Sequence, residues 1–270
     1  MTERLRDAIA KARAEREGLK SATAPSPAPE PLRSGVPAVV EPPPSDDPWL
    51  RLSALELDRK RLRSARIVSY DKSHPAHMHF DVLRTRLAQL FREKGWRRLA
   101  VTSPTAGCGK TMVAANLALS LARQRQLKTL LFDMDLRRPG LAQALGVETD
   151  RSIADLLNGE VPASDVLLRN GANLALGLNG QTVGESAELI QSDAAMAVLA
   201  EVIEAYQIDV ALFDLPPLIG SDDSVAFLPS VDCVLLVVAA NQSKAAEIET
   251  CERLIGENSN FLGVVLNKSD

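Results

Sequence analysis

The stretch VTSPTAGCGKTMVAANLALSLA, residues 101–122, predicts the end of a strand, a short loop and the opening turns of a helix. The small residues Ala106, Gly107 and Gly109 allow the loop backbone to turn its N–H groups inward. Those N–H groups and the positive end of the following helix favour a bound phosphate. The stretch therefore predicts a phosphate-binding loop.

Two residues at the start of the predicted helix add further chemistry. Lys110 supplies a positive charge for the outer phosphates, and Thr111 offers a hydroxyl oxygen to a magnesium ion. The pattern G-x-x-x-x-G-K-[ST] is incomplete, because Pro104 occupies the position of its first glycine. On the loop alone, the alternative is a tight strand-to-helix turn whose Lys110 is simply exposed.

Two further segments place carboxylates at strand ends. The segment TLLFDMDLRRP, residues 129–139, carries Asp133 and Asp135, and VALFDLPP, residues 210–217, carries Asp214. Acidic side chains at strand ends cost stability unless they meet a cation or hydrogen-bond donors. Beside a phosphate loop they suit a magnesium ion, a positioned water or a hydroxyl that awaits a base. The three segments together predict a site for a nucleoside triphosphate with Mg²⁺.

Strands and helices alternate from this loop onward. Six short and nearly continuous apolar runs are typical of strands covered by helices on both faces. They are RRLAVTS, LKTLLFD, NLALGL, DVALFD, DCVLLVVAA and FLGVVLN. Helical periodicity occupies residues 110–125, 185–206 and 244–256, and also 78–93 before the loop. The alternation predicts an α/β fold with a doubly wound, mostly parallel sheet, whose ligands bind outside the carboxyl ends of the strands.

The first 48 residues differ in composition from the rest. Residues 1–20 predict a short charged helix, either solvated or used to dock a partner. The proline-dense residues 21–48 predict a disordered or semi-extended linker without helix or sheet. The folded domain is expected at 49–270. Its basic run RKRLRSAR, residues 59–66, is either a solvated helix face or a surface for acidic lipid headgroups.

Composition bounds the location and the partners. The 270 residues carry a formal net charge of -4, which gives no reason to expect a nucleic-acid surface. Three scattered cysteines without metal spacing fit a reducing compartment. No N-terminal apolar core resembles a signal peptide, and the longest apolar run is too short to cross a bilayer. We therefore expect a cytoplasmic protein whose membrane contacts, if any, go through a partner or a surface.

Three motifs resemble those of one family. Residues 103–111, the DMDLR of 133–137 and the FDLPP of 213–217 look like the Walker A, A′ and B motifs of bacterial tyrosine kinases. These are the capsular and exopolysaccharide kinases, P-loop relatives of the partition ATPases. The resemblance covers about 69–270. It implies a P-loop NTPase fold, ATP and Mg²⁺ as cofactors, and tyrosine (auto)phosphorylation that regulates polysaccharide polymerisation and export.

The resemblance also assigns roles to residues. Thr111 would ligate Mg²⁺, with Asp135 and Asp214 in its first or second coordination shell. Asp133 would be the base that takes the proton of an incoming tyrosine hydroxyl, while Lys110 would hold the β- and γ-phosphates. Nucleotide contacts are expected from Ala106, Gly107, Cys108, Gly109, Lys110, Thr111, Met112, Arg137 and Asn267, with Asn267 near the adenine. Cys108 is expected to lend only its N–H, with a redox-sensitive thiol as the alternative.

The family's features extend to partners, and here the sequence departs from the pattern. The implied partner is the cytosolic segment of a membrane polysaccharide co-polymerase, which would recruit the chain to the inner face of the membrane. A homo-oligomer is implied through a Glu-x-x-Arg-x-x-Arg helix, but Met78, Asp81 and Arg84 occupy those positions. The family's C-terminal tyrosine cluster has no counterpart here. Tyr70 lies in a segment expected to be exposed and is the only obvious acceptor, whereas Tyr206 is expected in the core.

Two other functions stay open. The chain could be an ATP-binding regulator that changes a partner's state without phosphorylating tyrosine. It could also be a partition-type ATPase, although Thr105 stands where those enzymes place a signature lysine. A GTPase is a further variant, since NKSD at 267–270 matches N-K-x-D. We take this match as mostly chance, because an equivalent Asn-Lys is normal in the resembled ATPases.

Overall fold

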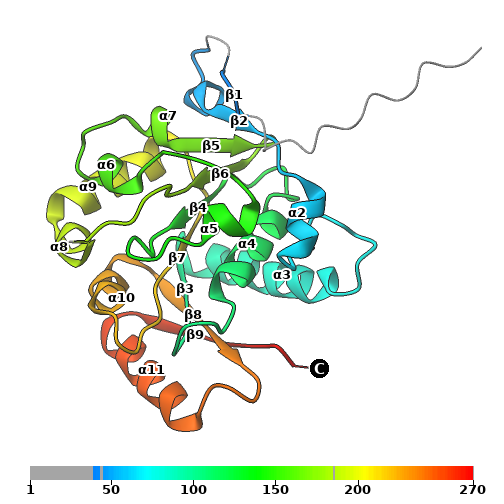
Figure 1. Ribbon diagram of the computed structural model, residues 1–270, viewed down its shortest axis with the longest axis vertical. Coiled ribbons are helices and arrows are strands. Elements are labelled where there is room, and N and C mark those ends of the chain that lie inside the picture. The colour runs from blue at the N-terminus through cyan, green and yellow to red at the C-terminus, as the bar shows by residue number, and fades with distance from the viewer. Residues whose placement is uncertain (1–38, 43–44, 185, 270) are drawn as a thin grey trace, which may run out of the picture. The chain divides into compact units, whose positions relative to one another are not determined.

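The computed structural model describes residues 39–42, 45–184 and 186–269. The predicted N-terminal helix and the linker up to residue 38 lie outside them. The described part forms one sheet of nine strands, in the order β1-β2-β5-β6-β4-β7-β3-β8-β9 (Figure 1). Neighbouring strands are parallel except in the pairs β1–β2 and β5–β6.

The bounds of the elements are as follows. The strands are β1 (Val39–Val40), β2 (Ser53–Leu55), β3 (Arg98–Thr102), β4 (Thr129–Asp133), β5 (Leu167–Asn170), β6 (Leu174–Gly177), β7 (Val210–Asp214), β8 (Cys233–Ala239) and β9 (Asn260–Asn267). The α-helices are α2 (Arg59–Ser64), α3 (His77–Lys94), α4 (Lys110–Leu121), α5 (Leu141–Leu145), α6 (Ile153–Leu157), α7 (Ala163–Val166), α8 (Ser186–Gln191), α9 (Asp193–Ala205), α10 (Asp222–Phe227) and α11 (Ala245–Asn258). Two 3₁₀ turns are η1 (Pro48–Arg51) and η2 (Leu228–Ser230).

The six apolar runs all form strands, namely β3, β4, β6, β7, β8 and β9. They are neighbours in the sheet and all pair in parallel. The predicted α/β fold with a mostly parallel sheet is therefore confirmed. The order also shows the doubly wound pattern, because the chain moves from β3 to β4 on one side and later returns past β7 to β8 and β9 on the other.

The strands β1, β2 and β5 were not predicted, and β1 lies in the segment that was expected to contain no sheet. Val39 and Val40 of β1 pair antiparallel with Leu55 and Ala54 of β2, although they lie in the proline-dense segment. The prediction that 21–48 contains no sheet is therefore wrong at these two residues. Proline removes only its own N–H from a ladder, and two consecutive valines are free to pair.

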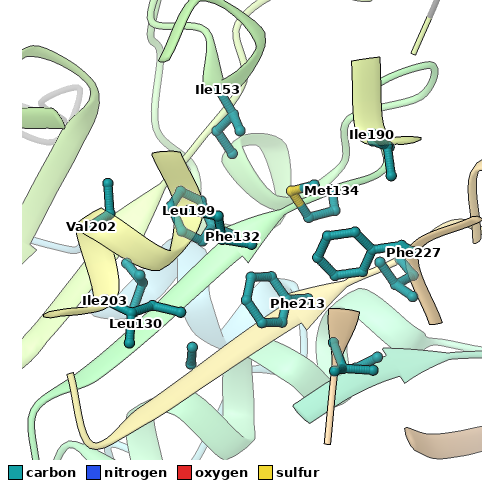
Figure 2. Close-up of a cluster of buried hydrophobic side chains, with 14 of the residues drawn as sticks. Leu130, Phe132, Met134, Ile153, Ile190, Leu199, Val202, Ile203, Phe213 and Phe227 are labelled. Carbon is teal, nitrogen blue, oxygen red and sulfur yellow. The ribbon is translucent and has the colours of Figure 1, made fainter. Parts of the chain in front are cut away.

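Side chains of the central strands alternate between two hydrophobic clusters, one on each face of the sheet. Leu130 and Phe132 of β4 pack with residues of α6, α8, α9 and α10, whereas Leu131 packs with residues of α4. In the first cluster the rings of Phe132, Phe213 and Phe227 lie together (Figure 2), with centroids 6.0 Å and 5.0 Å apart. This alternation explains why the strand sequences are apolar throughout.

Two helix predictions differ from the structure in length or number. The helix predicted at 110–125 ends as α4 at Leu121. The helix predicted at 185–206 is two helices, α8 and α9, because Ser192 begins a new one. The Ser192 hydroxyl accepts a hydrogen bond from the Ala195 N–H at 3.1 Å, which caps α9. The helix predicted at 78–93 is present as α3, one residue longer at each end.

Candidate nucleotide-binding site

The candidate site lies where the carboxyl ends of three adjacent strands meet. β4, β7 and β3 are neighbours, so the motifs that follow them in the sequence converge. Asp133 of β4 stands directly beside Asp214 of β7 in the register, and Asp214 also pairs with Val101 of β3. The phosphate loop leaves β3 after Thr102 and enters α4 at Lys110.

The loop is shaped by two left-handed glycines and by side chains from distant segments. Gly107 and Gly109 have φ angles of +82° and +94°. A Cβ atom at Gly109 would lie 2.2 Å from the side-chain nitrogen of Asn267. That nitrogen donates to the carbonyl of Cys108 at 2.8 Å, and the Gln242 amide donates to the carbonyl of Ala106 at 3.3 Å. Asn267 thus contacts the loop itself, and Gln242 is a site residue that no sequence motif indicated.

Lys110 is enclosed by carboxylates. Its Nζ lies 3.1 Å from Asp135 Oδ2 and 3.4 Å from Asp214 Oδ1, and its side chain is 13% exposed. Burial lowers the pKa of Lys110, but the charges of Asp214 and Asp135 outweigh it, so the pKa is raised above its ordinary value. The alternative of a simple turn with an exposed lysine is therefore wrong.

Asp214 carries a buried oxygen without a partner. Its residue is fully buried, and among the described residues its Oδ2 has no hydrogen-bond donor. Burial raises the pKa of Asp214, while the charge of Lys110 acts in the opposite direction. An unpaired buried carboxylate oxygen is costly unless a cation or a bound water faces it. Asp214, together with the Thr111 hydroxyl 3.4 Å from Lys110 Nζ, therefore fits a Mg²⁺ ion chemically.

Asp133 has a different environment. Its Oδ2 accepts hydrogen bonds from the N–H groups of Gly140 at 3.1 Å and Leu141 at 2.9 Å, and its Oδ1 accepts from Asp135 N at 3.3 Å. The residue is completely buried. Burial, and next the charge of Asp214, raise the pKa of Asp133 to about 7. Asp133 thus holds the turn before α5 rather than lining a cavity.

A cavity of about 430 Å³ adjoins the phosphate loop. It is lined by Thr105, Ala106, Gly107, Lys110, Asp135, Arg137, Arg138, Pro216, Pro217, Ile219, Gly220 and Ser221. Arg137, a predicted nucleotide contact, donates a hydrogen bond to Ser186 Oγ at 2.9 Å. It also forms ion pairs with the carboxylates of Asp222 and Asp223 at 3.1 and 2.9 Å. Sequence reasoning missed Arg138 and the loop from Ile219 to Ser221, which carry no motif.

A larger cavity of about 780 Å³ lies on the other side of α4. Met112 and Asn267, both predicted nucleotide contacts, line it together with apolar residues of α3 and β9 such as Leu83 and Val265. Its charged lining is basic, with Arg63, Arg66, Arg86 and Lys268. Of the predicted nucleotide contacts, Ala106, Gly107, Lys110 and Arg137 line the first cavity and Met112 and Asn267 the second, whereas Cys108, Gly109 and Thr111 line neither.

The Cys108 thiol lies behind the loop. Its Sγ is 3.6 Å from Ser243 Oγ and 3.8 Å from Thr105 Oγ1. Burial raises the pKa of this thiol, but the hydrogen bonds of Ser243 and Thr105 outweigh it, so the net shift is downward. Its full burial withholds the thiol from solvent oxidants.

The two tyrosines differ in exposure, and so do the motif positions on α3. Tyr206 belongs to the core, as predicted. Tyr70 is partly exposed: its hydroxyl donates to the carbonyl of Arg59 at 2.8 Å and its ring packs against the second cluster, while residues 72–75 after it are exposed, as predicted for this segment. On α3, Met78 is exposed, whereas Asp81 is paired with Arg84.

Comparison with known proteins places the chain among nucleotide-binding domains. A family model described as the CobQ/CobB/MinD/ParA nucleotide binding domain matches residues 99–270. The chain is 30% identical over 224 residues to the tyrosine-protein kinase CpsD of Streptococcus agalactiae, covering 80% of this chain and 90% of CpsD. It is 32% identical over 193 residues to EpsB of Ralstonia nicotianae, covering 70% of this chain and 25% of EpsB.

Two further similarities concern a transport protein and a solved structure. The chain is 32% identical over 182 residues to the succinoglycan biosynthesis transport protein ExoP of Rhizobium meliloti, covering 64% of this chain and 22% of ExoP. The chain thus spans about a quarter of the length of EpsB and ExoP. The kinase domain of the Escherichia coli tyrosine kinase ETK superposes with a TM-score of 0.67 at 27% identity, covering 74% of this chain and 79% of that domain.

Proposed function

Because this chain belongs to the CobQ/CobB/MinD/ParA nucleotide-binding family and, within it, to the bacterial P-loop tyrosine kinases, we propose that it is an ATP-dependent protein-tyrosine kinase. One observation carries the proposal. Lys110 is held between Asp135 and Asp214 at the meeting point of three parallel strands, beside a cavity lined by the phosphate loop. This arrangement provides one cation for phosphate and two carboxylates for Mg²⁺.

ATP and Mg²⁺ are the proposed cofactors. When bound, Mg²⁺ would neutralise charge on the transferred phosphoryl group. Thr111, Asp135 and Asp214 would hold the ion, and Lys110 would move from its carboxylate partners to the β- and γ-phosphates. The loop N–H groups from Ala106 to Thr111 would bind the phosphates, and the cavity beside Met112 and Asn267 would take the nucleoside.

Two carboxylates compete for the role of proton acceptor. The pKa of about 7 makes Asp133 a suitable base near neutral pH. Its oxygens, however, are engaged by backbone N–H groups, so it would receive the proton only if the turn at Gly140–Leu141 moved. Asp135 lines the cavity and needs no such movement. Asp133 remains our proposal for the base, and Asp135 for the metal ligand.

The biological setting is proposed from the named relatives. The similarity to ExoP supports a role in exopolysaccharide or capsule biosynthesis, with the cytosolic segment of a membrane polysaccharide co-polymerase as the partner. Within the described part of the chain, no helix combines the length and the apolar character needed to cross a bilayer. Recruitment from the cytoplasm to the inner face of the membrane, and assembly into a homo-oligomer, complete the proposal.

The test is transfer of labelled γ-phosphate from ATP in the presence of Mg²⁺. We expect phosphotyrosine on an added partner or tyrosine peptide, and loss of at least 100-fold in rate with Lys110→Ala, since that lysine stabilises charge in the transition state. Asp133→Asn should remove the neutral-pH limb of the rate profile while preserving Mg·ATP affinity. Asp135→Asn should weaken Mg²⁺ dependence instead. Labelling that survives Lys110→Ala would contradict the proposal.

The ATP-binding regulator is the second candidate, because Tyr206 is buried in the core and the Tyr70 hydroxyl is engaged by the carbonyl of Arg59. In that case ATP binding would reorganise the site without group transfer to tyrosine. ATP binding that depends on Lys110, together with no phosphotyrosine on any added substrate, would favour it. A partition-type ATPase shares the matching family model, but Thr105 stands where those enzymes place a signature lysine.

A further inference from the structure

The two tyrosines of the sequence do not present themselves to the candidate site. Tyr206 is 8% exposed and packs in the core between the sheet and α9. The hydroxyl of Tyr70 donates a hydrogen bond to the carbonyl of Arg59, and the guanidinium carbon of Arg59 lies 5.8 Å from the centroid of the Tyr70 ring. An acceptor tyrosine supplied by another polypeptide would need a place to dock beside the phosphate cavity.

A third space, an open groove of about 830 Å³, adjoins the phosphate cavity. Its lining is Arg137, Arg138, Pro139, Gly140, Gln143, Gly180, Gln181 and Thr182. Arg137 and Arg138 line both spaces, so the groove begins where the phosphate cavity ends. No residue of the phosphate loop borders the groove, which separates it from the nucleotide itself.

The charges along this groove are of one sign. Its charged lining residues are two arginines, and the remainder are glycine, proline and neutral polar side chains that suit an extended polypeptide. Arg137 is already neutralised by Asp222 and Asp223. The guanidinium of Arg138, in contrast, makes no ion pair or hydrogen bond with the described part of the chain. Arg138 therefore supplies the unsatisfied positive charge.

Backbone hydrogen bonds hold Arg138 next to Asp135. The Arg138 N–H donates to the carbonyl of Asp135 at 3.1 Å and to its Oδ1 at 3.2 Å. Two residues further on, the Gly140 N–H in the groove wall donates to Asp133. A tyrosine lying in the groove with its hydroxyl toward Lys110 would consequently have its neighbours in the peptide beside Arg138.

We propose that this groove docks the acceptor segment and that Arg138 is its specificity-determining residue, which selects an acidic side chain next to the tyrosine. The inference rests on the proposed kinase function. It adds the location and the chemical class of the substrate, an acidic tyrosine peptide. Charge pairing at a partly solvated arginine changes affinity by a modest factor, so the selection is a preference and not an absolute requirement.

The experiment compares two peptides with the full chain, one with tyrosine between glutamates and one with tyrosine between glutamines. We expect the glutamate peptide to have a KM about threefold to tenfold lower, at similar kcat. Arg138→Gln should remove this difference, and Arg138→Glu should invert it in favour of a lysine-flanked peptide. The control is Arg125→Gln, an exposed arginine after α4 outside the groove, which should keep the wild-type preference.

Two results would overturn the inference. One is a preference that persists in Arg138→Gln; the other is a rise in the KM for ATP in place of the peptide KM, which would place Arg138 on the nucleotide. Failure of the kinase proposal is recognised separately, as Lys110-dependent ATP binding without any labelled peptide. Fluorescence anisotropy of the glutamate peptide with ATP present then decides: binding weakened by Arg138→Gln supports the groove, and no binding overturns it.

Discussion

At the scale of single residues, Gly109 is where the loop depends on a distant side chain. We expect Gly109→Ala to weaken ATP binding at least tenfold, because a φ of +94° strains alanine and its Cβ would meet the Asn267 amide. The double variant with Asn267→Ala removes the collision but keeps the backbone strain, so it should recover part of the affinity. Titration with a fluorescent ATP analogue measures both, and equal affinities of wild type and Gly109→Ala would contradict this account.

Sequence reasoning could locate the residues whose charged side chains stand in a recognisable motif. Lys110, Asp135 and Asp214 belong to recognisable motifs at strand ends, and the structure places a carboxylate oxygen of each aspartate within 3.4 Å of Lys110 Nζ. Gln242 could not be located in this way, because its contact with the loop spans 136 residues and uses an ordinary amide. Arg138 was missed for another reason. The motif ends at its neighbour Arg137, but in the structure Arg137 is paired with Asp222 and Asp223, which leaves Arg138 as the one of the two arginines without an ion pair among the described residues.

At the scale of elements, α3 and α4 are joined by a partly buried ionic cluster around Asp81. Its carboxylate accepts hydrogen bonds from Arg84 at 3.0 Å, Arg123 at 2.8 Å and Ser120 at 2.8 Å. Burial raises the pKa of Asp81, but Ser120 and the two arginines outweigh it and hold the pKa below its ordinary value. The helix that starts at the phosphate loop is thus anchored to its neighbour by charge.

We expect Asp81→Ala to lower the free energy of unfolding by about 1–3 kcal/mol, because two partly buried guanidinium groups lose their partner. Urea denaturation followed by circular dichroism measures the change. Glu93→Ala, on the exposed end of the same helix, is the matched control, because among the described residues the Glu93 side chain accepts one hydrogen bond, from Gln89. It should change stability by less than about 0.5 kcal/mol. Equal losses in the two variants would show that the cluster does not anchor α4.

Element boundaries show where sequence patterns stop being informative. The apolar runs predicted the central strands because those strands are covered on both faces. The strands β1 and β2, at one end of the sheet, are too short to display a pattern, and their pairing depends on tertiary contact. The break between α8 and α9 has a local cause in Ser192, but its apolar periodicity continues across the break and conceals it.

At the scale of the whole molecule, the carboxylates of the site make stability depend on pH. The pKa of Asp133 is raised to about 7 and that of Asp214 is also raised, so the folded protein keeps protons that the unfolded chain has lost above about pH 4. The free energy of unfolding of the nucleotide-free protein should therefore fall as pH rises from about 4 to 7. The raised pKa of Lys110 acts only above its ordinary value of 10.5 and leaves this window unchanged.

Calorimetry of the nucleotide-free chain measures this dependence. We expect the melting temperature to fall by several degrees between pH 5 and 7.5, since the shift of Asp133 corresponds to a few kcal/mol. Asp133→Asn should flatten the profile, and saturating Mg·ATP should reduce the fall because a cation then faces the carboxylates. A melting temperature that rises across this range in the wild type would contradict the assigned protonation.

The side chains that brace the phosphate loop have a consequence for biosynthesis. The Cys108 carbonyl is held by Asn267, which leaves the ribosome 159 residues later, and Gln242 also arrives long after the loop it supports. During translation the phosphate loop is thus synthesised before the side chains that support it, and it gains its contact with Asn267 only after β9 has been made. Bound nucleotide would then stabilise only molecules in which Asn267 of β9 has reached the loop after β3, and incompletely synthesised chains would stay without ligand and open to proteolysis.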